Sequence, residues 1–162
     1  MRTSDIVKIA AFVPIYENNL GQCIKIFFRN GQTGLVDLSM RSFLKNAAKA
    51  FSLDLQEMRR RLAALTGQKN LLPLALSPFL LYIPLKCRKP IVKGDGAYGY
   101  FRLRSLLTAA ADPPPCTLTL EGGHQLTICQ SYRIVRQRLR MARKVEGFLL
   151  EEFYNSFRKG QA

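Results

Sequence analysis

The chain contains no tryptophan, a single histidine and few acidic residues. Its 162 residues include 11 Asp and Glu against 25 Lys and Arg, which gives a formal charge of +14. The one histidine, His124, lies beside a turn, where an imidazole is more typical of a solvated residue than of a general base. The excess of positive charge is larger than expected for a surface without a charged partner, and it indicates a polyanionic partner.

Long apolar segments are missing too. No run reaches the roughly 20 residues that cross a bilayer, and residues 1–5 lead into no signal-type apolar core. We therefore expect a soluble, cytoplasmic protein without a membrane partner. Glycine-rich phosphate loops, nucleophile elbows and paired carboxylates at motif spacing are also absent. We expect no enzymatic activity, no catalytic residue, no small-molecule substrate and no cofactor.

The cysteines form no CxxC pair and have no histidine at metal-ligand spacing. There are four of them: Cys23, Cys87, Cys116 and Cys129. The sequence therefore predicts no metal site, and it predicts ordinary thiols in a reducing compartment.

The first third of the chain begins with β-type segments. Ile6–Tyr16 and Ile24–Arg29 are rich in β-branched and aromatic residues, which predicts two strands. Asn30-Gly31 tolerates positive φ, so we expect the chain to reverse there into a short strand at Leu35–Leu38.

Two helices are expected next. Ser39 is a good N-cap, and apolar residues recur at helical spacing from Met40 to Phe51. A second helix is predicted over Leu53–Leu65, with Gly67 as its C-terminal stop. The first helix carries a stripe of cations that we interpret as a solvated face rather than a binding surface: Arg41, Lys45 and Lys49.

An apolar run interrupted by proline, Phe79–Leu85, follows the helices. Because Pro84 cannot donate to a β-ladder, the run predicts an edge strand or a strand that ends at Ile83. A further strand is expected over Tyr98–Leu103. Between these strands, residues 86–93 contain no acid and four cations: Lys86, Arg88, Lys89 and Lys93.

Residues 116–129 predict a β-hairpin, because apolar and polar residues alternate on both sides of Glu121–Gly123. A three-residue loop pairs Leu118 with Leu126 and places the apolar residues on one face. A turn made of the two glycines alone would mix the two faces. We therefore predict the three-residue loop.

A basic helix is expected after this hairpin. Six cations and no acid lie between Gly122 and Val145, and Ser131 can cap a helix within this stretch. Val135, Leu139 and Ala142 supply its inward stripe. The opposite side of the helix carries five cations: Arg133, Arg136, Arg140, Arg143 and Lys144.

Gly147 is expected to break this helix before a last segment, Phe148–Phe157. In that segment Leu149, Phe153 and Phe157 recur every four residues. We interpret this apolar stripe as core, with a partner surface as the alternative.

An arginine-rich face suits a polyanion, because the weakly hydrated guanidinium presents a planar fork to phosphate. Sequence specificity would need contacts to base edges or an A/T-rich groove. An RNA-binding or ribonucleoprotein accessory protein using the same face is one alternative, although the aromatic pattern of RNP motifs is absent. Another is an interaction protein whose basic surface docks an acidic partner.

Several segments occur in a recognisable order over about residues 5–145. They are Thr66-Gly67-Gln68-Lys69 leading to Pro73, the strand Phe79–Pro84, Gly99-Tyr100-Phe101, and the hairpin 116–128 with Ser131-Tyr132. This succession resembles the ComK-type competence transcription factors, and its last part is similar to the end of LytTR-type DNA-binding domains. The sequence departs from the ComK pattern at Ile83–Cys87 and in having Tyr100 near the family's tryptophan. The resemblance implies a bacterial DNA-binding transcription regulator, here expected to be an activator, that often acts on A/T-rich promoter elements and as an oligomer.

The sequence thus predicts an α+β fold with antiparallel β hairpins or sheets, two central helices and a basic C-terminal helix. We expect one domain over residues 1–162, with two lobes at 1–67 and 68–162 as an open alternative. The expected partner is double-stranded DNA, with a homo-oligomer left open. The predicted DNA-contacting residues are Lys86, Arg88, Lys89, Lys93, Arg133, Arg136, Arg140, Arg143 and Lys144.

Overall fold

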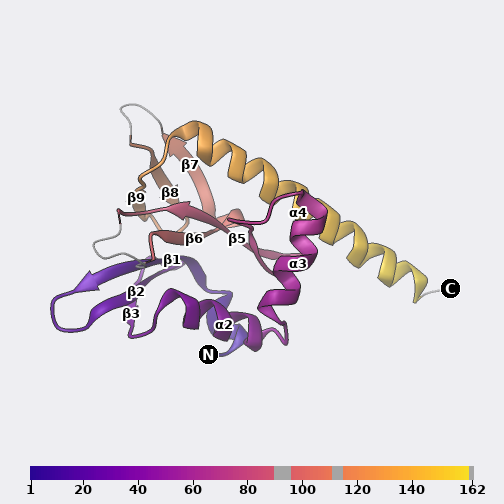
Figure 1. Ribbon diagram of the computed structural model, residues 1–162, viewed down its shortest axis with the longest axis horizontal. Helices are drawn as coiled ribbons and strands as arrows, with labels where there is room; N and C mark the ends of the chain where they lie inside the picture. Colours follow the sequence, from indigo (N-terminus) through magenta and orange to yellow (C-terminus); the bar gives the residue numbers. More distant parts are fainter. Residues whose placement is uncertain (90–95, 111–114, 161–162) are drawn as a thin grey trace.

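The computed structural model describes residues 1–89, 96–110 and 115–160 and confirms the α+β class (Figure 1). The elements follow in the order α1 (Thr3–Ile6), β1 (Ile9–Glu17), β2 (Gly21–Phe28), β3 (Thr33–Val36), α2 (Met40–Ala50), α3 (Leu55–Thr66), β4 (Leu74–Ser77), β5 (Leu80–Lys86), β6 (Tyr98–Arg102), a 3-10 turn (Leu103–Ser105), β7 (Leu106–Ala110), β8 (Thr117–Leu120), β9 (Gln125–Thr127) and α4 (Tyr132–Lys159). None of the helices in these ranges is long and apolar enough to span a membrane.

A six-stranded antiparallel sheet forms the centre of the molecule, in the order β3-β2-β1-β6-β5-β4. Strands from residues 1–67 and from residues 68–162 therefore share one sheet. One face packs against α2 through Phe43, Leu44 and Ala47. The other face packs against a second sheet, β7-β8-β9, and against the inner side of α4 (Figure 1). The two cores lie on opposite faces of the large sheet.

The three N-terminal strands form in the predicted order, but their bounds differ from the prediction. β2 begins at Gly21 rather than Ile24, and β3 covers Thr33–Val36 rather than Leu35–Leu38. The start of β1 differs as well. The sequence pattern began the strand at Ile6, but Ile6 ends the short helix α1 and β1 begins at Ile9. The buried Tyr82 hydroxyl lies between these elements, 3.1 Å from the carbonyl oxygen of Ile6 and 2.9 Å from that of Ile9. A side chain 73 residues away in the chain thus fixes the turn between α1 and β1.

Replacing Tyr82 with phenylalanine is expected to lower the free energy of unfolding by about 1–2 kcal/mol, because buried carbonyl groups lose their donor. Urea unfolding followed by circular dichroism measures this change. Tyr154→Phe is the control, since that side chain is exposed on α4. Equal stability of the Tyr82→Phe variant and the wild type would contradict the role of this hydroxyl.

Local caps set the ends of α2 and α3, and the predicted cap Ser39 and the predicted stop Gly67 are confirmed. Ser39 Oγ accepts a hydrogen bond from the Ser42 amide at 3.2 Å, and the Asp54 carboxylate accepts one from the Glu57 amide at 2.9 Å. Gly67 ends α3 in the left-handed conformation, with φ of 73°. The second helix begins two residues later than its apolar pattern suggested, because Asp54 provides the cap.

The predictions for β5 were wrong on both points. The strand runs through Pro84 to Lys86 and lies between β6 and β4, away from the edge. Pro84 is tolerated because β4 pairs only with Leu80–Tyr82, so no ladder partner from β4 reaches the proline. Beyond it, the backbone of Lys86 bonds to the segment before α4, through Cys129 N and Gln130 Oε1.

The second hairpin has the predicted register. Leu118 pairs with Leu126, and Thr117 pairs with Thr127. Leu118 and Leu120 are buried against the large sheet, while the threonines lie on the outer face. β7, which the sequence pattern did not predict, pairs with β8 and completes the small sheet.

The turns of the two hairpins pack against each other. His124 Nε2 lies 2.8 Å from the Phe28 carbonyl oxygen, and the His124 ring packs edge-on against Phe27. This histidine is therefore half-buried rather than fully solvated. Beside it, the Glu121 carboxylate accepts hydrogen bonds from Arg29 Nε at 3.0 Å and from Ser105 Oγ at 2.9 Å. The Arg29 hydrogen bond is the main reason that the pKa of Glu121 lies below its ordinary value.

The lowered pKa of Glu121 makes stability depend on pH. The carboxylate stabilises the fold fully above pH 4.5, its ordinary pKa, and this contribution is lost as the pH falls through the lower folded-state pKa. We expect the wild type to lose more stability than Glu121→Gln between neutral pH and pH values below 4.5. Urea midpoints at a series of pH values test this, and parallel curves for the two proteins would contradict it.

The C-terminal helix does not break at Gly147, contrary to the prediction. α4 is continuous over 28 residues, and Ser131 Oγ accepts from the Ile134 amide at 3.4 Å as the expected cap. A glycine within a helix costs only about 1 kcal/mol relative to alanine, and no proline is present to remove a hydrogen bond. Val145 and Leu149 pack against the core on either side of Gly147 and hold the helix through it.

Candidate nucleic-acid interface

The N-terminal half of α4 presents one face of cations, which we call the α4 cationic face. At 3.6 residues per turn its members lie within an arc of about 100° around the helix axis, and they span about 16 Å along it. The buried residues Val135, Ala142 and Val145 occupy the opposite side. The face consists of Arg133, Arg136, Arg140, Arg143 and Lys144.

All the side chains of the α4 cationic face are exposed. None of them forms a salt bridge with a carboxylate of the described residues, although Arg29, Arg61 and Arg104 do elsewhere. The guanidinium of Arg136 lies 5.8 Å from the ring centroid of Tyr132. The exposed charge predicted for this helix is therefore confirmed.

Two charged residues of the same helix do not belong to this face. Arg138 turns toward the core and is half-buried, and its Nε has no hydrogen-bond partner in the described ranges. Glu146 also lies on the inner side, where it accepts from Arg104 Nε at 3.2 Å. Its negative charge is thus directed away from the α4 cationic face, and its pairing with Arg104, 42 residues earlier in the chain, is a tertiary contact that the linear sequence could not show.

The basic loop after β5 lies next to the start of α4. The hydrogen bonds of the Lys86 backbone to residues 129 and 130 bring this lysine close to the Ser131 cap. Lys89 is exposed. Arg88 is half-buried and held in place, because its Nε donates to the Gly96 carbonyl oxygen at 2.8 Å and its guanidinium covers the Tyr16 ring at 4.6 Å. Lys93 lies outside the described residues.

A second group of cations lies on the other side of the large sheet. Arg41, Lys45 and Lys49 of α2 are exposed, and with Arg59 of α3 they line a hollow of about 660 Å³. This group provides an internal comparison for the α4 cationic face, because both carry arginine or lysine at four-residue spacing.

The apolar stripe at the end of α4 is not core, contrary to the interpretation preferred from sequence. Leu149 packs on the core, but Phe153 is 45% and Phe157 61% exposed. The C-terminal part of α4 extends beyond the sheets, so little of the protein is available to cover it (Figure 1). Phe153 contacts only Phe79 and Tyr154 as aromatic neighbours among the described residues.

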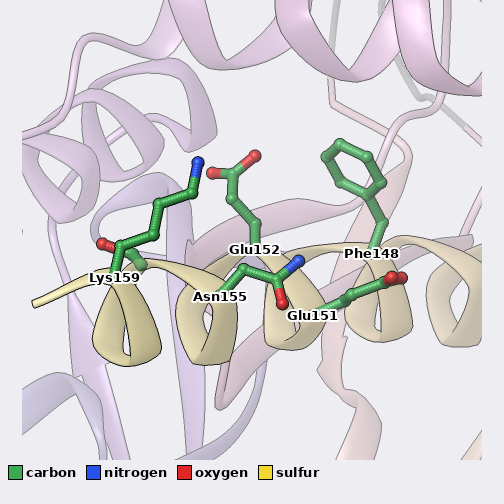
Figure 2. A pocket seen from close by; sticks show the side chains of 6 residues that line it. Phe148, Glu151, Glu152, Asn155 and Lys159 are labelled. Carbon is green, nitrogen blue, oxygen red and sulfur yellow. The ribbon is translucent and has the colours of Figure 1, made fainter. Parts of the chain in front are cut away.

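A surface hollow of about 480 Å³ also lies along this part of α4 (Figure 2). Figure 2 shows Phe148, Glu152 and Lys159 rising from the same helix, and every lining residue belongs to α4. Glu152 is already paired with Arg61 of α3. With a single helix as its wall, this hollow does not enclose a ligand.

The cysteines are all free, and no group of three metal-binding side chains occurs within residues 1–89, 96–110 and 115–160. Burial raises the pKa of Cys87 to about 12, so its sulfur is a neutral thiol at physiological pH. The sulfur lies 3.3 Å from the Leu85 carbonyl oxygen, to which the thiol donates.

Comparisons of the chain with protein-family models, with curated proteins and with solved structures find no match. The chemistry of the surface is therefore the basis for assigning a function.

Proposed function

We propose that the protein is a sequence-specific, double-stranded DNA-binding transcription regulator of the ComK type. The observation that supports this proposal best is the exposed α4 cationic face, whose five side chains have no carboxylate partner among the described residues. The segment order given above supports the choice of regulator class.

The dimensions and chemistry of this face fit a phosphate backbone. Phosphates of one DNA strand are spaced about 3.4 Å apart along the duplex axis, so a face about 16 Å long can meet several of them. Four of its five cations are arginines, which bind phosphate through two parallel hydrogen bonds. Lys86 and Lys89 extend the positive surface past the start of α4.

Phosphate contacts position a protein on DNA without reading its sequence. We propose that specificity comes from arginines of α4 that enter a narrow, A/T-rich groove, where the negative potential is strongest. No side-chain contact to a particular base is required for this mode of recognition.

A competition experiment tests the proposal. Labelled duplex DNA is bound at one fixed salt concentration and challenged with duplex DNA, duplex RNA and single strands. We expect duplex DNA to compete best, and selection from a random duplex library at the same salt to enrich A/T-rich sites. Stronger competition by RNA would replace the proposal with an RNA-binding role, and absence of binding to any nucleic acid would favour a protein partner.

A further inference from the structure

We propose that the space between the large sheet and β9 binds a small anionic amphiphile, a molecule with an apolar body and one carboxylate or sulfonate group. The hollow has a volume of about 490 Å³, within the roughly 300–1,000 Å³ that is usual for small-ligand sites. No residue of α4 lines it, and the proposal does not depend on DNA binding.

The floor of this hollow is apolar and is built from four separate parts of the chain. Antiparallel pairing of β1 with β2 and with β6 places their inward side chains on one face of the sheet. The second hairpin closes the space from the other side. The apolar lining residues are Val13, Pro14, Ile15, Phe27, Phe101, Leu126 and Ile128.

The charged side chains that line the hollow are all positive in the part of the chain that the structure describes. Lys25 Nζ, on β2, lies 5.4 Å from the Phe27 ring centroid. Arg88 and Lys89 line the hollow from the segment after β5. Among residues 1–89, 96–110 and 115–160, no Asp or Glu lines the hollow, and none of the three cations forms a salt bridge. Cations beside an apolar floor attract an anion more strongly than the same cations in open solvent.

Arg88 adds an unsatisfied donor. Its guanidinium is fixed by the Gly96 carbonyl oxygen and the Tyr16 ring, but its Nη1 is buried and has no hydrogen-bond partner among the described residues. A buried N–H without an acceptor is unfavourable, and a carboxylate is the acceptor that suits a guanidinium best. An amphiphile seated in the hollow would bring its acid group to the Arg88 guanidinium while its apolar body covers Val13 and Phe27.

The probe for this site is 1-anilinonaphthalene-8-sulfonate, which combines aromatic rings with a sulfonate and fluoresces in apolar surroundings. Titration of the full chain without DNA is expected to give saturable binding of one molecule. Decanoate should displace the probe at least about tenfold better than decanol, because only decanoate carries the charge. Equal displacement by both compounds would overturn the proposal.

Variants locate the site. Lys25→Gln/Lys89→Gln is expected to weaken probe binding about tenfold, while Lys45→Gln/Lys49→Gln, which removes the same charge from α2, should leave it unchanged. Phe153→Ser/Phe157→Ser should also bind normally, which separates this hollow from the exposed aromatic side chains of α4. Loss of the signal in the phenylalanine variant, or unchanged binding in Lys25→Gln/Lys89→Gln, would overturn the assignment. Circular dichroism confirms that each variant is folded.

Discussion

Replacing Arg136 and Arg140 together with glutamine is expected to lower the affinity for duplex DNA about 30-fold at about 0.15 M salt. Each phosphate contact contributes about 0.9 to the slope of log affinity against log salt concentration, so two lost contacts should reduce that slope by about 1.8. Both side chains are exposed and have no carboxylate partner among the described residues, so their removal should not change the fold. Gel-shift titrations over a range of salt concentrations measure both quantities.

The matched control is Arg41→Gln/Lys45→Gln on α2. It removes two positive charges at the same four-residue spacing, from a helix on the opposite side of the large sheet. We expect its affinity and salt slope to stay near those of the wild type. If the α2 variant loses binding and the α4 variant does not, the α4 cationic face is not the DNA-binding surface.

Replacing Gly122 with alanine is expected to lower the free energy of unfolding by about 4 kcal/mol. Gly122 has φ of 92°, and a Cβ there would lie 2.9 Å from Arg29 O, Gly31 N and Phe28 O. These are backbone atoms. A hydrogen bond from Gly31 N to Phe28 O joins two of them, and a second bond, from Arg29 N to Lys8 O, holds the same turn in place. The clash must therefore separate the two hairpin turns or distort one of them.

Gly123→Ala provides the control for this prediction. Gly123 has a similar φ of 81°, but nothing lies within 4 Å of the Cβ that alanine would add. The Gly123→Ala variant should lose only about 1 kcal/mol of unfolding free energy, which is the cost of placing a residue with a Cβ at positive φ. Urea unfolding gives the loss of unfolding free energy for each variant, and the difference between the two losses measures the effect of the clash between the turns. Equal losses would contradict the prediction that close packing of the turns makes Gly122 necessary.

Local signals in the sequence were sufficient for the parts of the fold that depend on neighbouring residues. Ser39 and Ser131 cap their helices because the hydroxyl reaches an amide three residues ahead, which needs no tertiary context. The register of the second hairpin follows from alternation alone, since a shift of one residue would move Leu118 to the solvent face. The α4 cationic face is predictable for the same reason, because helical periodicity fixes which side chains share a side.

Tertiary structure decided what each element lies next to. Pro84 is tolerated inside the sheet because the pairing with β4 does not extend to it. Which strands lie beside β5 depends on contacts between segments far apart in the chain, and the sequence of β5 alone does not specify them. Phe153 and Phe157 have the spacing of a core stripe, but α4 extends past the sheets and leaves them uncovered. From the sequence, Arg88 looks like a cation in an open loop, but contacts with Tyr16 and Gly96 hold it in place. The sequence by itself determined which residues share a face, while burial required knowing which distant segment covers that face.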